Sequence, residues 1–160
     1  MQLMRWRYVE KRPIIWVDES WFAHDVYRPF GYSRIGKLCY GKKDWEAKGR
    51  TNVIGALLGK RLLCSYLINC NVDSDVFHAW ITQQLLPVVP KNAVIIMDNA
   101  SFHKRKDTQQ AIADAGFILE FLPPYSPQLN PIEKFWAKAK AIRRKFKCSV
   151  EELFGTLLHN

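Results

Sequence analysis

Residues 93–103 read Ala-Val-Ile-Ile-Met-Asp-Asn-Ala-Ser-Phe-His, an apolar run that ends at Asp98. A short apolar run of this kind, rich in β-branched side chains, predicts a strand that is buried on both faces. Residues 13–18, Pro-Ile-Ile-Trp-Val-Asp, repeat the pattern and end at Asp18. Open α/β sheets bind ligands at the carboxyl ends of their strands. The two runs therefore predict neighbouring central strands whose aspartates face a common site.

The remaining elements are predicted from periodicity and from turn residues. Two strand patterns, 51–58 and 61–69, flank Gly59-Lys60, which indicates a hairpin. The later part of the chain alternates helix patterns with one short strand. These elements are a helix from Asp73 or Ser74 to about Leu86, a helix over 104–115, a strand over 117–121, a helix from Asn130-Pro131 to about 147 and a short helix over 149–158.

The order of these elements predicts the α/β class. Antiparallel strands come first and βαβ units follow, which indicates a mixed sheet with helices on both faces. Residues 21–49 are predicted to be irregular, with one short strand near 38–40. A single domain is expected over 13–160, preceded by a basic arm over 1–12.

Composition narrows the class of partner. The chain has 160 residues, is 48% hydrophobic and carries a net charge of +9, which suits a polyanion such as nucleic acid. Charge alone fits a merely basic surface equally well. No apolar run approaches the length of a membrane span, and no signal peptide is recognisable, so a cytoplasmic protein without a membrane partner is expected. The four cysteines form no C-x-x-C pair, which argues against structural zinc.

A third acidic residue, Glu133, follows Asn130-Pro131 near the start of the last long helix. Two aspartates and one glutamate supply the oxygen ligands that hard divalent cations prefer. Each aspartate alone could simply begin a turn, and Glu133 could be the third residue of a capping box that starts at Asn130. Both roles are compatible at Glu133, because it lies at the edge of the predicted buried stripe.

Polar and basic residues accompany this acidic set. Alternation along the strand points Glu19 away from Asp18, so it is predicted to be a neighbour of the site and not a ligand. Asn99 and His103 are predicted to lie beside the ligands, although His103 could equally be an ordinary loop histidine. Phosphate contacts are predicted for Lys104, Arg105, Lys138, Lys140, Arg143 and Arg144. For the cations near the helix end, the alternative is a solvated end that complements the helix dipole.

The motif Asp98-Asn-Ala-Ser-Phe-His103, together with Leu122-Pro-Pro-Tyr-Ser-Pro-Gln-Leu-Asn-Pro-Ile-Glu133-Lys-Phe-Trp136, resembles the catalytic signature of mariner-type DDE transposases. The similarity is greatest to the bacterial insertion-sequence-six-thirty branch, in which 34 residues separate the second Asp from the Glu, as they do here. The resemblance covers residues 13–150.

This resemblance implies a ribonuclease-H-like fold and two Mg²⁺ or Mn²⁺ ions held by Asp18, Asp98 and Glu133. It implies DNA end cleavage followed by strand transfer, typically at a TA step, by a homodimer in the bacterial nucleoid. Full-length relatives also carry an N-terminal helix-turn-helix region that reads the transposon ends. The first catalytic Asp lies only 17 residues from the start of this sequence, so a separate helix-turn-helix chain is a possible partner.

Two other functions fit the same features. A ribonuclease-H-like nuclease would cut strands without joining them. A transposase-derived module for DNA binding or assembly would use only the basic surface. The intact acidic triad argues against that module, because three converging carboxylates would repel DNA.

Overall fold

A computed structural model describes residues 5–23, 49–124 and 126–155 of the chain. Its strands form one five-stranded sheet in the order β3-β2-β1-β4-β5. The first three strands of the chain pair antiparallel, whereas β1 with β4 and β4 with β5 pair parallel, which confirms the predicted mixed sheet. The strands are β1 (Ile14–Ala23), β2 (Arg50–Leu58), β3 (Arg61–Ile68), β4 (Val94–Met97) and β5 (Ile118–Phe121).

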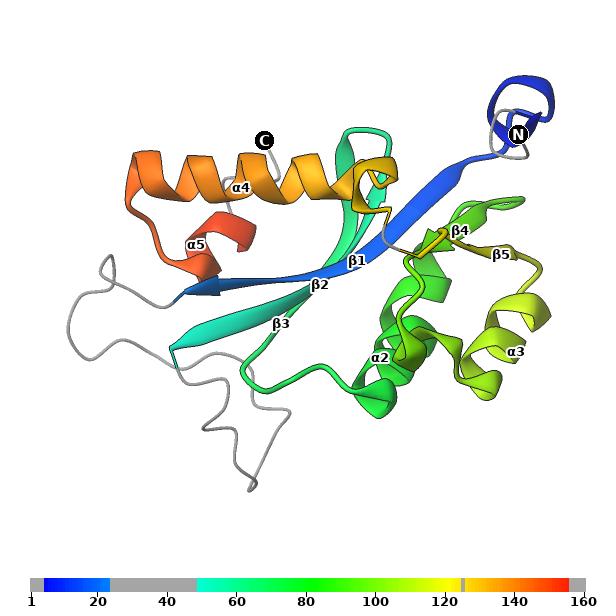
Figure 1. Cartoon of the computed structure of the whole chain (residues 1–160), viewed down its shortest axis with the longest axis horizontal. Coiled ribbons are helices and arrows are strands. Elements are labelled where there is room, and N and C mark those ends of the chain that lie inside the picture. The colour runs from blue at the N-terminus through cyan, green and yellow to red at the C-terminus, as the bar shows by residue number, and fades with distance from the viewer. Residues whose placement is uncertain (1–4, 24–48, 125, 156–160) are drawn as a thin grey trace.

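Helices cover both faces of the sheet, with α4 and α5 on one side and α2 and α3 on the other (Figure 1). Alternate residues of β1 supply the two cores, because successive side chains of a strand point to opposite faces. Trp16 packs with Trp136 in one apolar cluster, and Ile15 packs with Phe77 in the other. The helices are α2 (Ser74–Trp80), α3 (Lys106–Asp114), α4 (Ile132–Phe146) and α5 (Val150–Gly155), with shorter helical turns at Arg5–Val9, Ile81–Leu85, Leu86–Val88, Ser101–Lys104 and Pro127–Leu129.

Strand β1 is longer than the sequence predicts, and Asp18 lies inside it instead of at its end. The reason is the antiparallel partner, since β2 continues to pair with β1 from Glu19 opposite Ile54 to Ala23 opposite Arg50. The parallel partner stops earlier, with Met97 opposite Val17. Asp18 therefore marks the end of the parallel pairing, although the strand itself continues.

Most other predicted boundaries agree with the structure. The hairpin turns at Gly59, whose φ of +66° suits glycine, and the predicted helix after Asp73 begins with the Asp73 carboxylate accepting from Val76 N at 2.9 Å. Trp6, from the segment predicted as a basic arm, is buried in the core. The strand predicted near 38–40 and the end of the last predicted helix lie outside the described residues. None of the described helices has the length and apolar character needed to cross a bilayer.

Gly55 of β2 leaves room for the Trp136 side chain of α4. A Cβ atom added there would lie 2.7 Å from Cη2 of Trp136, a side chain that is itself buried. We expect Gly55→Ala to lower the free energy of unfolding by about 1–3 kcal/mol, because the packed indole has to move. Gly155→Ala is the control, since a Cβ there meets nothing within 4 Å. Denaturant titration measures both variants, and a Gly55→Ala variant as stable as wild type would contradict this packing.

Candidate active site

The sheet register brings the two aspartates of the sequence motifs to neighbouring positions. Val17 pairs with Met97, so Asp18 and Asp98 are the next residues on adjacent parallel strands. Asp18 is 6% exposed and lies opposite Gly55, whereas the Asp98 side chain is 45% exposed. One aspartate is therefore buried in the sheet, and the other stands at the open end of β4.

Helix α4 carries Glu133 to the same place. Its first turn is capped by Asn130, whose side-chain oxygen accepts from Ile132 N at 3.2 Å. The Glu133 backbone N–H donates to the Asn130 carbonyl at 3.0 Å, but in the described structure no hydrogen bond joins the Glu133 carboxylate to the Asn130 amide. The Glu133 carboxyl group instead lies close enough to Asp18 to raise the pKa of that aspartate. Among the described residues, the second half of the predicted capping box therefore does not form, and Glu133 lies near Asp18.

The pairing of Asp18 with Glu133 has an electrostatic cost. Burial raises the pKa of Asp18, and the nearby carboxylates of Glu19 and Glu133 raise it further, to about 8. Neighbouring negative charge disfavours ionisation of the buried Asp18, so this aspartate holds its proton to an unusually high pH. A divalent cation at this position would replace that proton.

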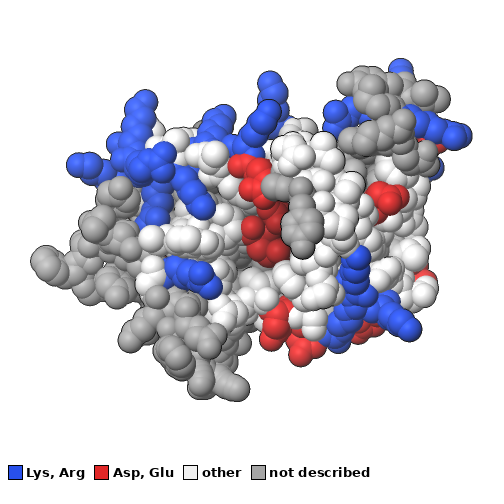
Figure 2. Space-filling model, in the orientation of Figure 1, with Lys and Arg blue, Asp and Glu red and all other residues white. Residues whose placement is uncertain are grey.

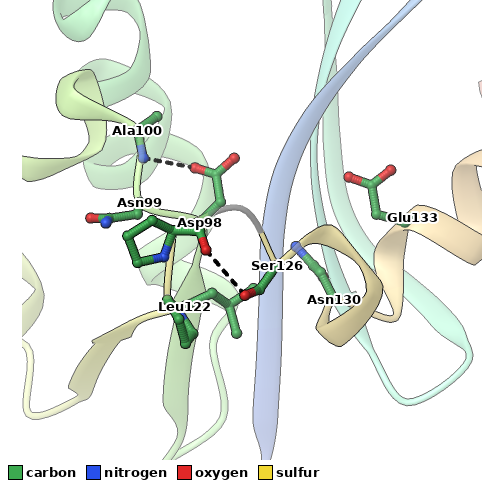
Figure 3. Close-up of a pocket in the computed structure, with 9 residues that line it drawn as sticks. Asp98, Asn99, Ala100, Leu122, Ser126, Asn130 and Glu133 are labelled. Atoms are coloured by element: carbon green, nitrogen blue, oxygen red, sulfur yellow. Dashed lines mark hydrogen bonds between the residues drawn. The ribbon is translucent and has the colours of Figure 1, made fainter.

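Asp98 is held by different partners. Its Oδ1 atom accepts from Ala100 N at 3.1 Å (Figure 3). The same atom lies 2.8 Å from Nδ1 of His103. The hydrogen bond from His103 holds the pKa of Asp98 below its usual value. Burial alone would lower the pKa of His103, but its hydrogen bonds to Asp98 and Glu19 outweigh burial and raise it to about 10. The imidazole is therefore protonated and donates to a carboxylate on each side.

A pocket of about 480 Å³ is lined by Asp98 and Glu133. In Figure 3 these two side chains lie on opposite sides, with Ser126 and Asn130 between them. Pro123 and Pro124 also line the pocket. Within the part of the chain that the structure describes, no three His, Cys, Asp or Glu residues are grouped closely enough to hold one metal ion. The three carboxylates form two groups, Asp18 with Glu133 and Asp98 with His103.

The residues predicted to lie beside the ligands are Asn99, His103 and Glu19. Asn99 lines the pocket, and none of the described residues hydrogen-bonds to its buried side-chain oxygen. His103 does contact Asp98, as predicted, and is fully buried. The sequence did not reveal that Glu19 contacts His103, because alternation places Glu19 on the far face of the sheet without saying what covers that face. The helical turn Ser101–Lys104 brings the imidazole there.

Of the residues predicted to contact DNA, some are exposed to solvent and others contact neighbouring side chains. Lys138 and Arg144 are exposed on α4, and Lys140 lies with its Nζ atom 5.4 Å from the centre of the Trp21 ring. Figure 2 shows acidic side chains in a band near the middle of one face, with Lys and Arg side chains along α4 beside it. Lys104 lies over the Phe121 ring, with Nζ 5.2 Å from its centre. The described α4 cations therefore border the acidic band.

Two of the predicted DNA contacts have structural roles instead. Arg143 is 6% exposed, and its Nε atom donates to the Cys148 carbonyl at 3.1 Å, which ties the end of α4 to the following turn. A buried guanidinium in this position does not reach DNA. The sequence shows the charges near the helix end but not which side of the helix is buried, so the prediction for Arg143 is wrong.

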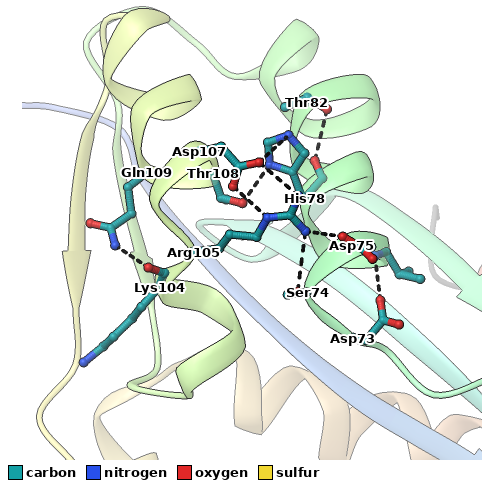
Figure 4. A network of polar contacts seen from close by, with 11 residues as sticks. Asp73, Ser74, Asp75, His78, Thr82, Lys104, Arg105, Asp107, Thr108 and Gln109 are labelled. Atoms are coloured by element: carbon teal, nitrogen blue, oxygen red, sulfur yellow. Dashed lines mark hydrogen bonds and ion pairs between the residues drawn. The ribbon is translucent and has the colours of Figure 1, made fainter.

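Arg105 is engaged in a network between α2 and α3 (Figure 4). It donates to both carboxylate oxygens of Asp107, at 2.7 and 3.0 Å, and it also pairs with Asp75. Beside it, Nδ1 of His78 lies 2.8 Å from the Thr108 hydroxyl. With both sides of its guanidinium occupied by carboxylates, Arg105 links two helices and is not a free phosphate contact.

The sheet order, with helices on both faces, matches a ribonuclease-H-like fold. Residues 13–153 match the DDE superfamily endonuclease family, and the chain belongs to that family. No curated relative matches the sequence.

Three solved structures illustrate the similarity of fold. A pre-cleavage Mos1 transpososome matches with a TM-score of 0.65 and 15% identity, covering 98% of this chain and 51% of that one. The Mos1 paired-end complex with the left transposon end gives 0.63 and 15%, covering 89% and 46%. The catalytic domain of Mos1 mariner transposase gives 0.61 and 14%, covering 88% and 67%. The chain thus spans about half the length of the Mos1 chains in the two complexes.

Proposed function

We propose that this chain is the catalytic domain of a mariner-type transposase of the insertion-sequence-six-thirty branch, which cleaves DNA ends and transfers strands with the help of divalent cations. The observation that carries the proposal is the placement of three carboxylates at one end of the sheet. Asp98 and Glu133 line one pocket, and the buried Asp18 lies near Glu133 on the strand next to that of Asp98. Membership of the DDE superfamily endonuclease family supports it.

The residues present suit Mg²⁺ or Mn²⁺. All three proposed ligands are carboxylates, the donors that hard cations prefer, and the raised pKa of Asp18 indicates negative charge in need of a cation. Structures of the Mos1 catalytic domain with Raltegravir include both Mn and Mg, which supports a divalent cation in this fold. We propose that Asp18, Asp98 and Glu133 hold two such ions. Bound there, the ions would activate the attacking oxygen and stabilise the leaving oxygen of an in-line displacement.

The chain's own residues would position the DNA. Asn99 and Ser126 line the pocket with an amide and a hydroxyl that can hydrogen-bond to phosphate oxygens. The neighbouring prolines form a wall that cannot donate hydrogen bonds. Lys138 and Arg144, both exposed on α4, can neutralise phosphates farther along the duplex. These contacts read no sequence, so they would position the cleaved strand without selecting it.

Recognition of particular transposon ends would then come from elsewhere. We propose that the active complex is a homodimer and that a helix-turn-helix region, on a separate chain if not on this one, reads the ends. A TA target and a place in the bacterial nucleoid are part of the same proposal. Neighbouring solved structures of Mos1 include a strand transfer complex and a paired-end complex, which supports work on DNA ends in pairs.

The test uses a pre-cut DNA end, supercoiled plasmid and Mn²⁺. Wild type should both nick the plasmid and join the end to it, and both activities should disappear in Asp98→Asn and in EDTA. Asp114→Asn is the matched control, since Asp114 is an exposed aspartate on α3 that pairs with Gln110. Nicking without joining would establish the nuclease that cuts only. Activity that survives in Asp98→Asn would overturn the proposed site.

A further inference from the structure

A buried imidazole connects two carboxylates from strands and loops far apart in the sequence. Nε2 of His103 lies 2.8 Å from Oε2 of Glu19, and Nδ1 lies 2.8 Å from Oδ1 of Asp98. The imidazole is fully buried, and the Glu19 side chain is 18% exposed. The three residues form a continuous chain of hydrogen bonds that runs from the α2 face of the sheet to the pocket.

Glu19 is suited to fixing the orientation of this ring. Aromatic rings lie against the imidazole, with the centres of Phe77 and Phe102 at 4.5 and 4.4 Å. Such contacts confine the plane of the ring but do not determine which nitrogen faces Asp98. A buried ring nitrogen without a partner is costly, so the Glu19 carboxylate at Nε2 selects the orientation that leaves Nδ1 toward Asp98.

The orientation of the imidazole affects the two oxygens of the Asp98 carboxylate differently. Both of its hydrogen-bond donors, His103 Nδ1 and Ala100 N, contact the same oxygen, Oδ1. In the described part of the chain, no hydrogen bond or ion pair reaches Oδ2. One oxygen is therefore anchored to the protein, and the other is left for a ligand in the pocket.

We propose that Glu19 is a positioning residue that acts through His103, holding the imidazole so that Asp98 keeps Oδ2 directed at the bound cation. This inference rests on the proposed metal site. Glu19 itself does not bind the ion, because it lies on the opposite face of β1 from Asp18 and its carboxylate is already engaged. Hydrogen-bond partners of this kind orient metal ligands, and losing one typically weakens metal binding by about 10–100-fold.

The experiment measures Mn²⁺ binding to the protein without DNA by isothermal titration calorimetry. Glu19→Ala is expected to weaken binding by about 10-fold, whereas Glu19→Gln should stay within about 3-fold of wild type, because its amide oxygen still accepts from Nε2. In a His103→Gln background, Glu19→Ala should produce little further loss, since its effect passes through the ring. Thermal melts establish that each variant is folded, and Glu120→Gln, an exposed glutamate on β5, is the control.

Several outcomes of this experiment would contradict the proposed role of Glu19, and each has a different meaning. Equal losses in Glu19→Ala and Glu19→Gln would overturn positioning and assign the effect to charge. Unchanged binding in Glu19→Ala, despite a lower melting temperature, would show that the pair only stabilises the fold. An additive loss in the His103→Gln background would overturn the route through the imidazole. Wild type that binds no Mn²⁺ would overturn the proposed function as well, which distinguishes that failure from the others.

Discussion

Glu133→Gln is expected to reduce Mn²⁺-dependent nicking and joining by at least about 10³-fold, which corresponds to roughly 4 kcal/mol of lost transition-state stabilisation. The change keeps the shape of the side chain and removes its charge. The α4 cap should survive, because it is formed by the Asn130 side chain and by the Glu133 backbone N–H, not by the Glu133 carboxylate. The loss should therefore reflect cation binding and not unfolding.

Initial rates of plasmid nicking measure this effect, with circular dichroism to establish the fold. Glu120→Gln is the control, because it removes an exposed glutamate from β5, away from the pocket. It should nick at the wild-type rate. A Glu133→Gln variant that retains more than about a tenth of wild-type activity would remove Glu133 from the site, since a charge that holds the cation cannot be lost at so small a cost.

The second large effect concerns stability and pH in the absence of metal. Burial and the neighbouring carboxylates raise the pKa of Asp18 from 3.8 to about 8, so the folded state binds this proton more tightly than the unfolded state. The stabilising contribution is complete below pH 4 and is lost as the pH rises to about 8. His103, with its pKa raised from 6.5 to about 10, loses its contribution over that higher range. In EDTA, the free energy of unfolding should therefore fall between pH 5 and pH 9.

Asp18→Asn should reverse this behaviour, because the neutral amide needs no proton. We expect the metal-free variant to be more stable than wild type by about 2 kcal/mol at pH 8, with a flatter pH profile. Mg²⁺ should stabilise wild type and leave the variant nearly unchanged. Urea titrations at several pH values measure both effects, with Asp114→Asn as the control. A variant that is less stable than wild type at pH 8 would contradict the strained Asp18–Glu133 contact.

The sequence was sufficient to predict the fold because its strongest patterns are local. The apolar run before Asp98, the hairpin at Gly59 and the cap at Asp73 each carry their own signal, and the structure has all three. The error at Asp18 arose because β1 continues through polar residues once β2 pairs with it. A pairing partner that follows later in the chain leaves no mark on the strand itself.

The surroundings of the site were less predictable. Glu19 and His103 meet across 84 residues, and nothing in their local sequence indicates that the loop after β4 folds over the far face of β1. Arg105 and Arg143 were assigned to DNA because charge is visible in a sequence and burial is not. The structure places Arg105 between two carboxylates and buries Arg143 in the last turn of α4.

Crystals grown with Mn²⁺ provide the most direct measurement of the proposed cation site, through anomalous diffraction at the manganese edge. We predict peaks at the pocket between Asp98 and Glu133, within about 2.0–2.6 Å of carboxylate oxygens from Asp18, Asp98 and Glu133. The Asp18–Glu133 contact should open to admit the ion. Well-ordered crystals with no peak at the pocket, or with manganese bound only at other residues, would contradict the account.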